Sequence, residues 1–285
     1  MRLDRFLTLH FFYPFISKIS FHNQDSFVPI LMYHSISSEC EKMGKPYYDI
    51  HTSPEVFRQH MSYLHRNQYK TINLSEALCY LTSNFPTPGK TVVLTFDDGY
   101  EDFYHTAMPI LKEFGFSAIV YLPTAYIDNE SLNLRGKSHL NWIQVRELIK
   151  EGVFFGSHTV NHPQLRDLRP EGIVYELRHS KDAIEDNTGM KVESFSYPFA
   201  FPETDTRFSR RLRSDLQKCG YRNGVCTRVG TVKKGDDAFF LKRIPVNLHD
   251  DIPFLRAKLE GGYDWLNIFQ YIFKFLKQRI KKLHA

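Results

Sequence analysis

Residues 91–100 read TVVLTFDDGY, and this stretch places an apolar strand directly before two neighbouring acidic side chains, Asp97 and Asp98. Residues 91–96 are β-branched or apolar and lie between glycine-containing turns, which predicts a buried strand. Proteins of the α/β class keep their chemistry at the carboxyl ends of such strands. Asp97 and Asp98 are therefore candidate functional residues, although Asp-Asp-Gly is also a common turn at the end of a strand.

The same alternation of short apolar runs and helical patterns continues through most of the chain. Strands are expected at residues 28–33, 91–96, 117–122, 153–156, 194–198, 223–227 and 241–246. Helices are expected at residues 53–66, 101–115, 142–150, 170–187 and 206–219, and at 75–83 with Ser75 as the N-cap. About seven β/α units predict a parallel barrel or a doubly wound sheet, with the functional site at the carboxyl ends of the strands.

The composition is that of a globular protein with a modest positive charge. Of 285 residues, 42% are hydrophobic and 15% aromatic, which is enough for the core of one large α/β domain. The net charge is +5, and residues 263–285, with five Lys or Arg and one Asp, carry +4 of it. The nearly neutral body disfavours nucleic acid as a partner and fits a glycan. The four cysteines, Cys40, Cys79, Cys219 and Cys226, match no metal-site spacing and are interpreted as free thiols.

Both ends of the chain differ from the central region. We expect three parts: an aromatic and basic segment at 1–27, a barrel domain at 28–262 and an amphipathic basic helix at 263–285. The first segment has no small-residue cleavage site and no apolar run of about 20 residues, which favours a cytoplasmic location over a secreted or periplasmic one. The last helix either covers the barrel or docks on an anionic membrane surface.

A second set of polar residues follows another predicted strand. In GSHTVNHPQL, His158 and His162 come directly after the strand at 153–156, again at a carboxyl end. The H-x-x-x-H spacing in a turn places both imidazoles on one side, and imidazole with carboxylate suits zinc or a similar divalent ion. The alternative is a pair of surface histidines at the start of a helix.

Three motifs in order resemble a known family. TFDDGY (95–100), SHTVNH (157–162) and FSYPFA (195–200) are similar to the first three motifs of the polysaccharide deacetylases, carbohydrate esterase family 4, also called the NodB-homology domain. The resemblance spans about residues 28–250. It implies an incomplete (β/α)7 barrel and metal-dependent removal of N- or O-acetyl groups from sugars; for an N-acetyl group the reaction is hydrolysis of a linear amide.

The resemblance also implies a role for each motif residue. Asp98, His158 and His162 would bind the divalent metal ion, which we expect to be zinc, and Asp97 would be the general base. The oxyanion would be held by the metal and by a backbone N–H in Tyr197-Pro198-Phe199, that of Phe199.

Two expected features are missing from their motifs. The third motif of the family commonly opens with an arginine that orients the base, and no arginine stands in the matching stretch 194–198. The motif with acidic residues before a tryptophan is not evident either, although Trp142 lies at a suitable place.

The general acid has two candidates, His34 and His249. His34 ends the strand at 28–33, and this arrangement resembles the circularly permuted branch of the family that acts on poly-N-acetylglucosamine, in which the last barrel strand is moved to the front. Such a strand would lie beside the strand that carries Asp97. His249 follows a strand that contains Pro245, which favours a sheet edge. We therefore prefer His34.

The leading functional hypothesis is a metal-dependent hydrolase that removes acetyl groups from N-acetylhexosamine units of an exopolysaccharide or a lipid-linked glycan. One alternative is an amidase of the same chemistry that acts on chitin, peptidoglycan or a small imide. Another is a non-catalytic glycan-binding module, which is disfavoured because it would need no unligated Asp97.

Overall fold

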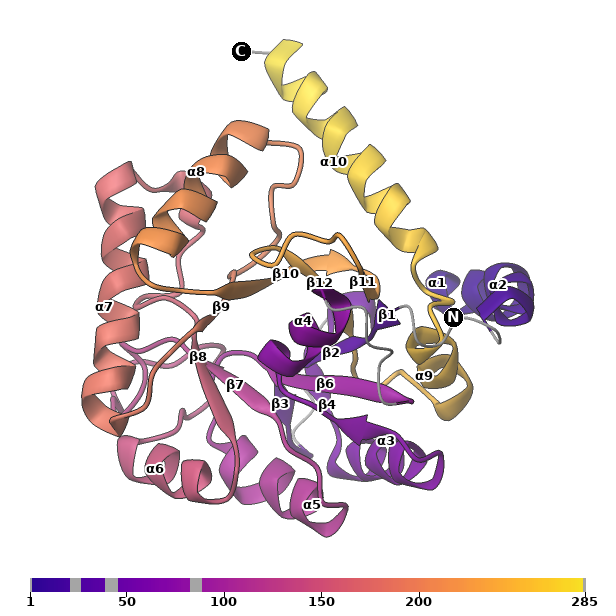
Figure 1. Ribbon diagram of the computed structural model, residues 1–285, viewed down its shortest axis with the longest axis horizontal. Coiled ribbons are helices and arrows are strands. Elements are labelled where there is room, and N and C mark those ends of the chain that lie inside the picture. Colours follow the sequence, from indigo (N-terminus) through magenta and orange to yellow (C-terminus); the bar gives the residue numbers. More distant parts are fainter. Residues whose placement is uncertain (1, 21–26, 39–45, 83–88, 284–285) are drawn as a thin grey trace.

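The computed structural model describes residues 2–20, 27–38, 46–82 and 89–283. At its centre seven parallel strands form a closed barrel, with helices around the outside (Figure 1). In order around the barrel these are β2 (Ile30–Tyr33), β6 (Thr91–Phe96), β7 (Ile119–Leu122), β8 (Phe154–Ser157), β9 (Ser194–Ser196), β10 (Asn223–Val229) and β12 (Leu241–Pro245). The (β/α)7 barrel is thus confirmed, and the doubly wound sheet is excluded.

The first strand of the barrel closes the ring. β2 pairs with β6, where Tyr33 lies opposite Phe96, and also with β12, where Met32 lies opposite Pro245. The expectation that Pro245 marks a sheet edge is wrong. Pro245 is the last residue of β12, and the ladder continues past it because the Val246 N–H donates to the Met32 carbonyl (3.0 Å).

The helices that follow the strands lie close to their expected positions. They are α3 (Pro54–Arg66), α5 (Met108–Glu113) after the π-helical stretch η4 (Phe103–Ala107), α6 (Trp142–Lys150), α7 (Pro170–Thr188) and α8 (Thr206–Lys218). One more helix, α9 (Ile252–Leu259), follows β12 with Asp251 as its N-cap. Ser53 caps α3 by accepting a hydrogen bond from the Val56 N–H. The cap predicted at Ser75 is wrong, because α4 (Leu74–Thr82) begins one residue earlier, after Asn73, which exchanges hydrogen bonds with Glu76.

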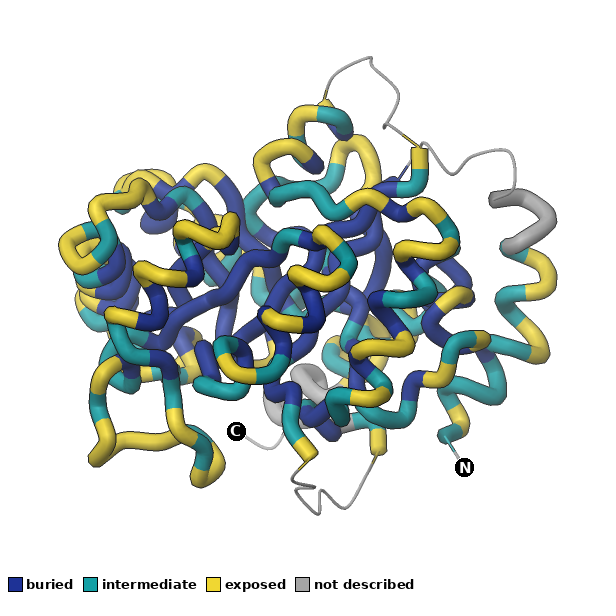
Figure 2. The backbone as a smooth tube through the Cα atoms, turned by 90° about the horizontal axis from the view of Figure 1, so that it is seen from below, coloured by how far each residue is buried: buried dark blue, intermediate teal, exposed yellow. Residues whose placement is uncertain are grey.

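Alternating side chains divide the strands between two hydrophobic clusters. Val93 and Tyr121 point into the barrel, whereas their neighbours Leu94 and Val120 pack against the outer helices. The strands are buried on both faces (Figure 2). Helix α4 packs against the inner cluster beside the early residues of the strands, so the carboxyl ends remain available for the site.

Short elements and the two chain ends complete the structure. These are the antiparallel pair β1 (Phe27–Val28) and β11 (Val232–Lys233), the parallel pair β3 (Ser35–Ile36) and β4 (His51–Thr52), β5 (Lys70–Thr71) beside β6, the 3₁₀ helices η3 (Pro46–Tyr48) and η5 (Leu165–Asp167), and α1 (Leu3–Leu7), the π-helical η1 (Thr8–Phe12), α2 (Tyr13–Ser20) and α10 (Trp265–Leu283). In the described ranges, no helix has the length and apolar character to cross a membrane. Cys79, Cys219 and Cys226 are free thiols, and Cys40 lies outside the described residues.

Candidate active site

The two neighbouring aspartates reach the same site through different backbone conformations. Asp97 continues the inward alternation of Val93 and Thr95 along β6, and its side chain is 3% exposed. In an extended strand Asp98 would point to the opposite face. Instead Asp98 adopts a left-handed conformation with φ of 71°, and its carboxylate turns to the two histidines that follow β8.

Four non-glycine residues of the site have positive φ. These values are 71° at Asp98, 73° at Thr159, 53° at His162 and 58° at Phe199. Side chains disfavour this region, and such conformations gather where the surrounding structure holds functional groups in place.

Asp98, His158 and His162 converge as a candidate set of metal ligands. The Asp98 Oδ1 atom lies 3.4 Å from His158 Nε2 and 3.3 Å from His162 Nε2, and one ligand atom from each residue lies within 4.8 Å of the others. A tetrahedral ion bound at about 2.0–2.1 Å separates its ligand atoms by roughly 3.4 Å. The three side chains therefore fit one divalent ion.

A hydrogen bond determines which nitrogen of His158 faces this set. The Nδ1 atom lies 2.8 Å from the Ser196 carbonyl oxygen, to which only a protonated nitrogen can donate. In the neutral ring the lone pair is then on Nε2, as a metal ligand requires. Burial opposes ionisation of Asp98, but the neighbouring His158 and His162 lower the pKa of its carboxyl well below the usual value.

A buried glutamate of α7 holds the loop that carries the two histidines. The Glu176 carboxylate accepts hydrogen bonds from Val160 N (2.7 Å), Asn161 N (2.9 Å) and Asn161 Nδ2 (2.7 Å). Nothing in the sequence marks Glu176 for this role, because an acidic residue in a helical pattern is usually solvent-exposed.

Arg243 supplies the arginine that the third motif lacks. It comes from β12, is fully buried, and makes two hydrogen bonds to Asp97, Nη1 to Oδ1 (2.7 Å) and Nη2 to Oδ2 (2.6 Å). Ser196 also donates to Asp97 (3.2 Å). An arginine that orients Asp97 is thus present but on another strand. The sequence signal for it was a cation inside the apolar run LKRIPV.

Asp97 is ionised and remains outside the set of metal ligands. Burial by itself would raise the pKa of Asp97, but the charge of Arg243 and its hydrogen bonds lower the pKa below the usual value. A carboxylate held in this way is available to accept a proton.

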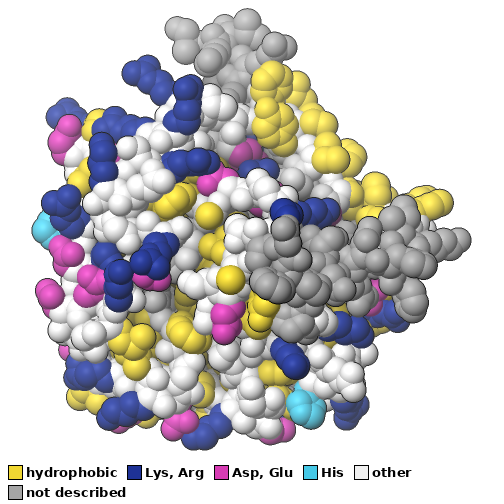
Figure 3. Space-filling view, in the orientation of Figure 1, with side chains coloured by type: hydrophobic (Ala, Val, Ile, Leu, Met, Phe, Trp, Pro, Cys, Tyr) yellow, Lys and Arg dark blue, Asp and Glu magenta, His cyan; other side chains and the backbone are white. Residues whose placement is uncertain are grey.

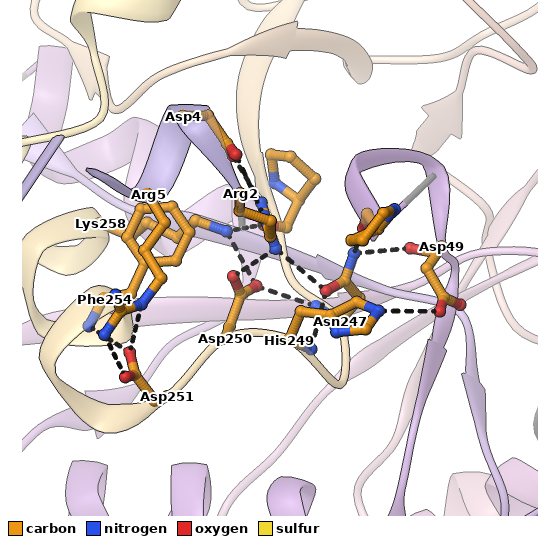
Figure 4. Close-up of polar contacts among 12 residues, drawn as sticks. Arg2, Asp4, Arg5, Asp49, Asn247, His249, Asp250, Asp251, Phe254 and Lys258 are labelled. Atoms are coloured by element: carbon orange, nitrogen blue, oxygen red, sulfur yellow. Dashed lines mark hydrogen bonds and ion pairs between the residues drawn. The ribbon is translucent and has the colours of Figure 1, made fainter. Parts of the chain in front are cut away.

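The structure brings His34 to the site, but not His249. His34 Nε2 lies 4.0 Å from Asp97 Oδ2, and burial lowers the pKa of His34 despite the nearby charges of Asp98 and Asp97. His249 Nε2 lies instead 3.4 Å from Asp49 Oδ2, and its backbone N–H donates to Asn247 (Figure 4). The reason is that the chain leaves the barrel wall after β12.

The third motif places one amide at the edge of the site. The Tyr197 N–H is used by the sheet, since it donates to the Val225 carbonyl (3.0 Å), and Pro198 has no N–H. The Phe199 N–H makes no hydrogen bond within the described part of the chain, and the Phe199 ring lies 4.6 Å from that of His162. Trp142 packs against the hydrophobic core at the start of α6.

The chain is similar to known deacetylases in sequence. The family model for polysaccharide deacetylase matches residues 84–224. YxkH of Bacillus subtilis (strain 168), assigned by name to the polysaccharide deacetylases, is 31% identical over 236 residues, which are 83% of this chain and 75% of YxkH. Poly-beta-1,6-N-acetyl-D-glucosamine N-deacetylase of Staphylococcus aureus is 22% identical over 221 residues, 74% of this chain and 73% of the relative.

Solved structures agree with this assignment. The Streptococcus pyogenes deacetylase PplD, in complex with acetate, is 26% identical with a TM-score of 0.71, and the match covers 82% of this chain and 98% of PplD. IcaB from Ammonifex degensii shares the fold at 23% identity and a TM-score of 0.69, covering 83% of this chain and 98% of IcaB. Sequence and fold together place this chain in the polysaccharide deacetylase family.

Proposed function

We propose that this polysaccharide deacetylase uses zinc to remove acetyl groups from N-acetylhexosamine units of an exopolysaccharide or a lipid-linked glycan. The observation that carries the proposal is the buried, ionised Asp97 next to the Asp98–His158–His162 set but outside it. The name of the Staphylococcus aureus relative supports a poly-β-1,6-N-acetylglucosamine substrate.

The residues divide the chemistry between them. A divalent ion held by Asp98, His158 and His162 would polarise the acetyl carbonyl and lower the pKa of a water molecule. Asp97 accepts the proton of that water, and Arg243 keeps the Asp97 carboxylate in position.

His34 and Phe199 serve the later part of the reaction. His34 Nε2, 4.0 Å from Asp97, can receive the proton that Asp97 has taken up and pass it to the leaving amine. This route suits a ring that burial keeps neutral at rest. The Phe199 N–H is available to donate to the oxyanion.

An acetate-release assay tests this function. We expect acetate from β-1,6-linked N-acetylglucosamine oligomers, with loss of activity in chelator and recovery when zinc is added back. If acetate were released only from β-1,4-linked chitin oligomers or from peptidoglycan, that glycan would be the substrate instead of the proposed one. Glycan binding without acetate release by the zinc-loaded protein would support the binding module instead.

A further inference from the structure

Helix α10 turns its polar side toward the barrel. Gln270 accepts a hydrogen bond from the Val229 N–H (3.0 Å). Lys274 donates to the Phe201 carbonyl (2.9 Å) and to Glu203 (2.7 Å). These contacts hold the helix beside the loop that follows Phe199.

The apolar side of α10 is consequently exposed. An amphipathic helix of a soluble domain normally buries this side against the core. Here the exposed side chains range from Phe275 at 39% to Phe273 at 69%. They are Ile268, Phe269, Tyr271, Ile272, Phe273, Phe275 and Leu276. Figure 3 shows hydrophobic side chains along α10 on the side away from the barrel. A continuous apolar surface of this kind marks an interaction site.

The N-terminal helices extend this surface. Trp265, at the start of α10, stacks on Phe12 with ring centroids 4.5 Å apart, and its indole N–H donates to Thr8 (3.0 Å). Phe11 and Phe15, in the same N-terminal region, are 53% and 71% exposed. The two ends of the chain therefore contribute to one apolar region, which we call the terminal face (α10 with Phe11 and Phe15).

The charge of the terminal segment identifies what covers this face. Besides Lys274, which pairs with Glu203, residues 265–285 contain Lys277, Arg279, Lys281 and Lys282 and no Asp or Glu. Aromatic and aliphatic side chains together with cations suit the interface of an anionic bilayer. A second copy of the chain would instead bring two cationic segments together, which costs free energy.

We propose that the terminal face docks on an anionic lipid bilayer, with α10 parallel to the membrane plane. Because Lys274 fastens α10 to the loop after Phe199, the docked helix holds the carboxyl ends of the barrel strands near the lipid headgroups. A glycan attached to or growing at the membrane is then within reach. The docking itself does not depend on the proposed reaction.

Vesicle flotation tests the docking. The wild-type protein should float with vesicles of equal parts phosphatidylcholine and phosphatidylglycerol, less with phosphatidylcholine alone, and less in high salt. The double variant Phe269→Ser/Phe273→Ser should bind roughly tenfold more weakly or worse, because two exposed aromatic rings no longer enter the interface. The matched control is Ile143→Ser, which removes a side chain that is 62% exposed on α6 and should bind as the wild type does.

Separate measurements keep the test decisive. Thermal unfolding of the double variant should match the wild type, since both rings are exposed. Equal flotation of wild type and double variant would overturn the proposal, as would equal binding to neutral vesicles. The proposal would also be overturned if the wild type did not float and sedimentation showed that it is a dimer while the double variant is a monomer. The terminal face would then bind a second copy of the chain.

Discussion

Two buried carboxylates near β12 are both paired with cations, yet only one lies at the candidate active site. Asp97 is paired with Arg243 inside the barrel. Asp250 belongs to the Asp250 cluster (Arg2, Asp4, Asn247, Asp250 and Lys258), which joins α1 to the barrel wall (Figure 4). In that cluster Asp250 Oδ1 accepts from Arg2 (2.9 Å), and Oδ2 accepts from Lys258 (2.8 Å) and Asn247 N (2.9 Å).

The difference lies in what surrounds each pair. Asp97 lies beside His34 and next to Asp98, whose carboxylate meets two imidazoles. Among the described residues, the only group of three or more side chains placed to hold a metal ion is that of Asp98, and the Asp250 cluster has none. Burial beside a cation therefore stabilises the carboxylate in both places, and only Asp97 also lies next to the candidate ligand set that its proposed role as base requires.

The largest effect is expected from the metal ligands. Asp98→Ala, His158→Ala and His162→Ala should each lose the bound metal and all measurable turnover, because two remaining ligands form an incomplete set. Metal content of the purified proteins measures this directly. His105→Ala is the control, since the His105 side chain is 61% exposed. Normal metal content in all three variants would contradict the assignment of Asp98, His158 and His162 as metal ligands.

Asp97→Asn should separate the base from the ligands. The amide fills the same space but accepts no proton, so turnover should fall by about 10²–10⁴-fold while metal content stays near normal. Single-turnover acetate release and metal analysis of the same sample check both points. Loss of metal from a folded variant would instead make Asp97 a ligand.

His34→Ala should fold, hold metal and lose about 10²–10⁴-fold in rate on an N-acetyl substrate. An activated ester leaves without needing a proton, so much of the relative activity should return on such a substrate. The control, His249→Ala, should change either rate only slightly, since His249 contacts Asp49 and not the site. Equal losses on amide and ester would argue that His34 has no role as an acid.

Arg243→Gln should move the acidic side of the pH profile of kcat/KM to higher pH. Arg243 lowers the pKa of Asp97, so without that charge burial dominates and the pKa rises. Stability depends on pH in the same direction. The Asp97–Arg243 pair stabilises the folded protein fully above the pKa that Asp97 has in the unfolded chain. This stabilisation is lost as the pH falls through the lower pKa that Asp97 has in the folded protein. The control is Arg222→Gln, because the Arg222 side chain is 68% exposed. If the pH profile were unchanged in both variants, Arg243 would have no role in the mechanism.

Lys258→Met should have the smallest effect on turnover. It removes one of the two cations that pair with Asp250, and because Arg2 remains, the free energy of unfolding should fall by about 1.5–3 kcal/mol, the range for a hydrogen bond to a charged group. At a temperature where the variant is folded, kcat should equal that of the wild type. Denaturant unfolding and acetate release measure the two quantities, and a large fall in kcat would connect the Asp250 cluster to the reaction.

Local patterns in the sequence were enough for much of the fold and for part of the site. The helix predicted at 142–150 is α6 residue for residue, and the strands before Asp97 and His158 are β6 and β8. These features depend on residues that are close together in the sequence, so the hydrophobic periodicity is enough to predict them. The convergence of Asp98, His158 and His162 followed from two strands that end at the same face of a parallel barrel.

Other features depend on contacts between distant parts of the chain. Arg243 and Asp97 are 146 positions apart, and no local pattern relates β12 to β6. Likewise, the stripe of α10 predicted an amphipathic helix but not which side meets the barrel. The orientation of α10 is set by its hydrogen bonds to Val229, Phe201 and Glu203, which lie in other parts of the chain.

The position of β2 in the ring has a consequence for biosynthesis. Its strand partners are β6 and β12, so the segment that ends in His34 leaves the ribosome before either partner and is fully paired only after residues 241–245 have emerged. Until then one edge of β2 stays open, and Asp97 lacks its arginine. A nascent chain that stops before β12 should therefore bind chaperones or aggregate through that edge, and catalytic competence should arise only after β12 has emerged.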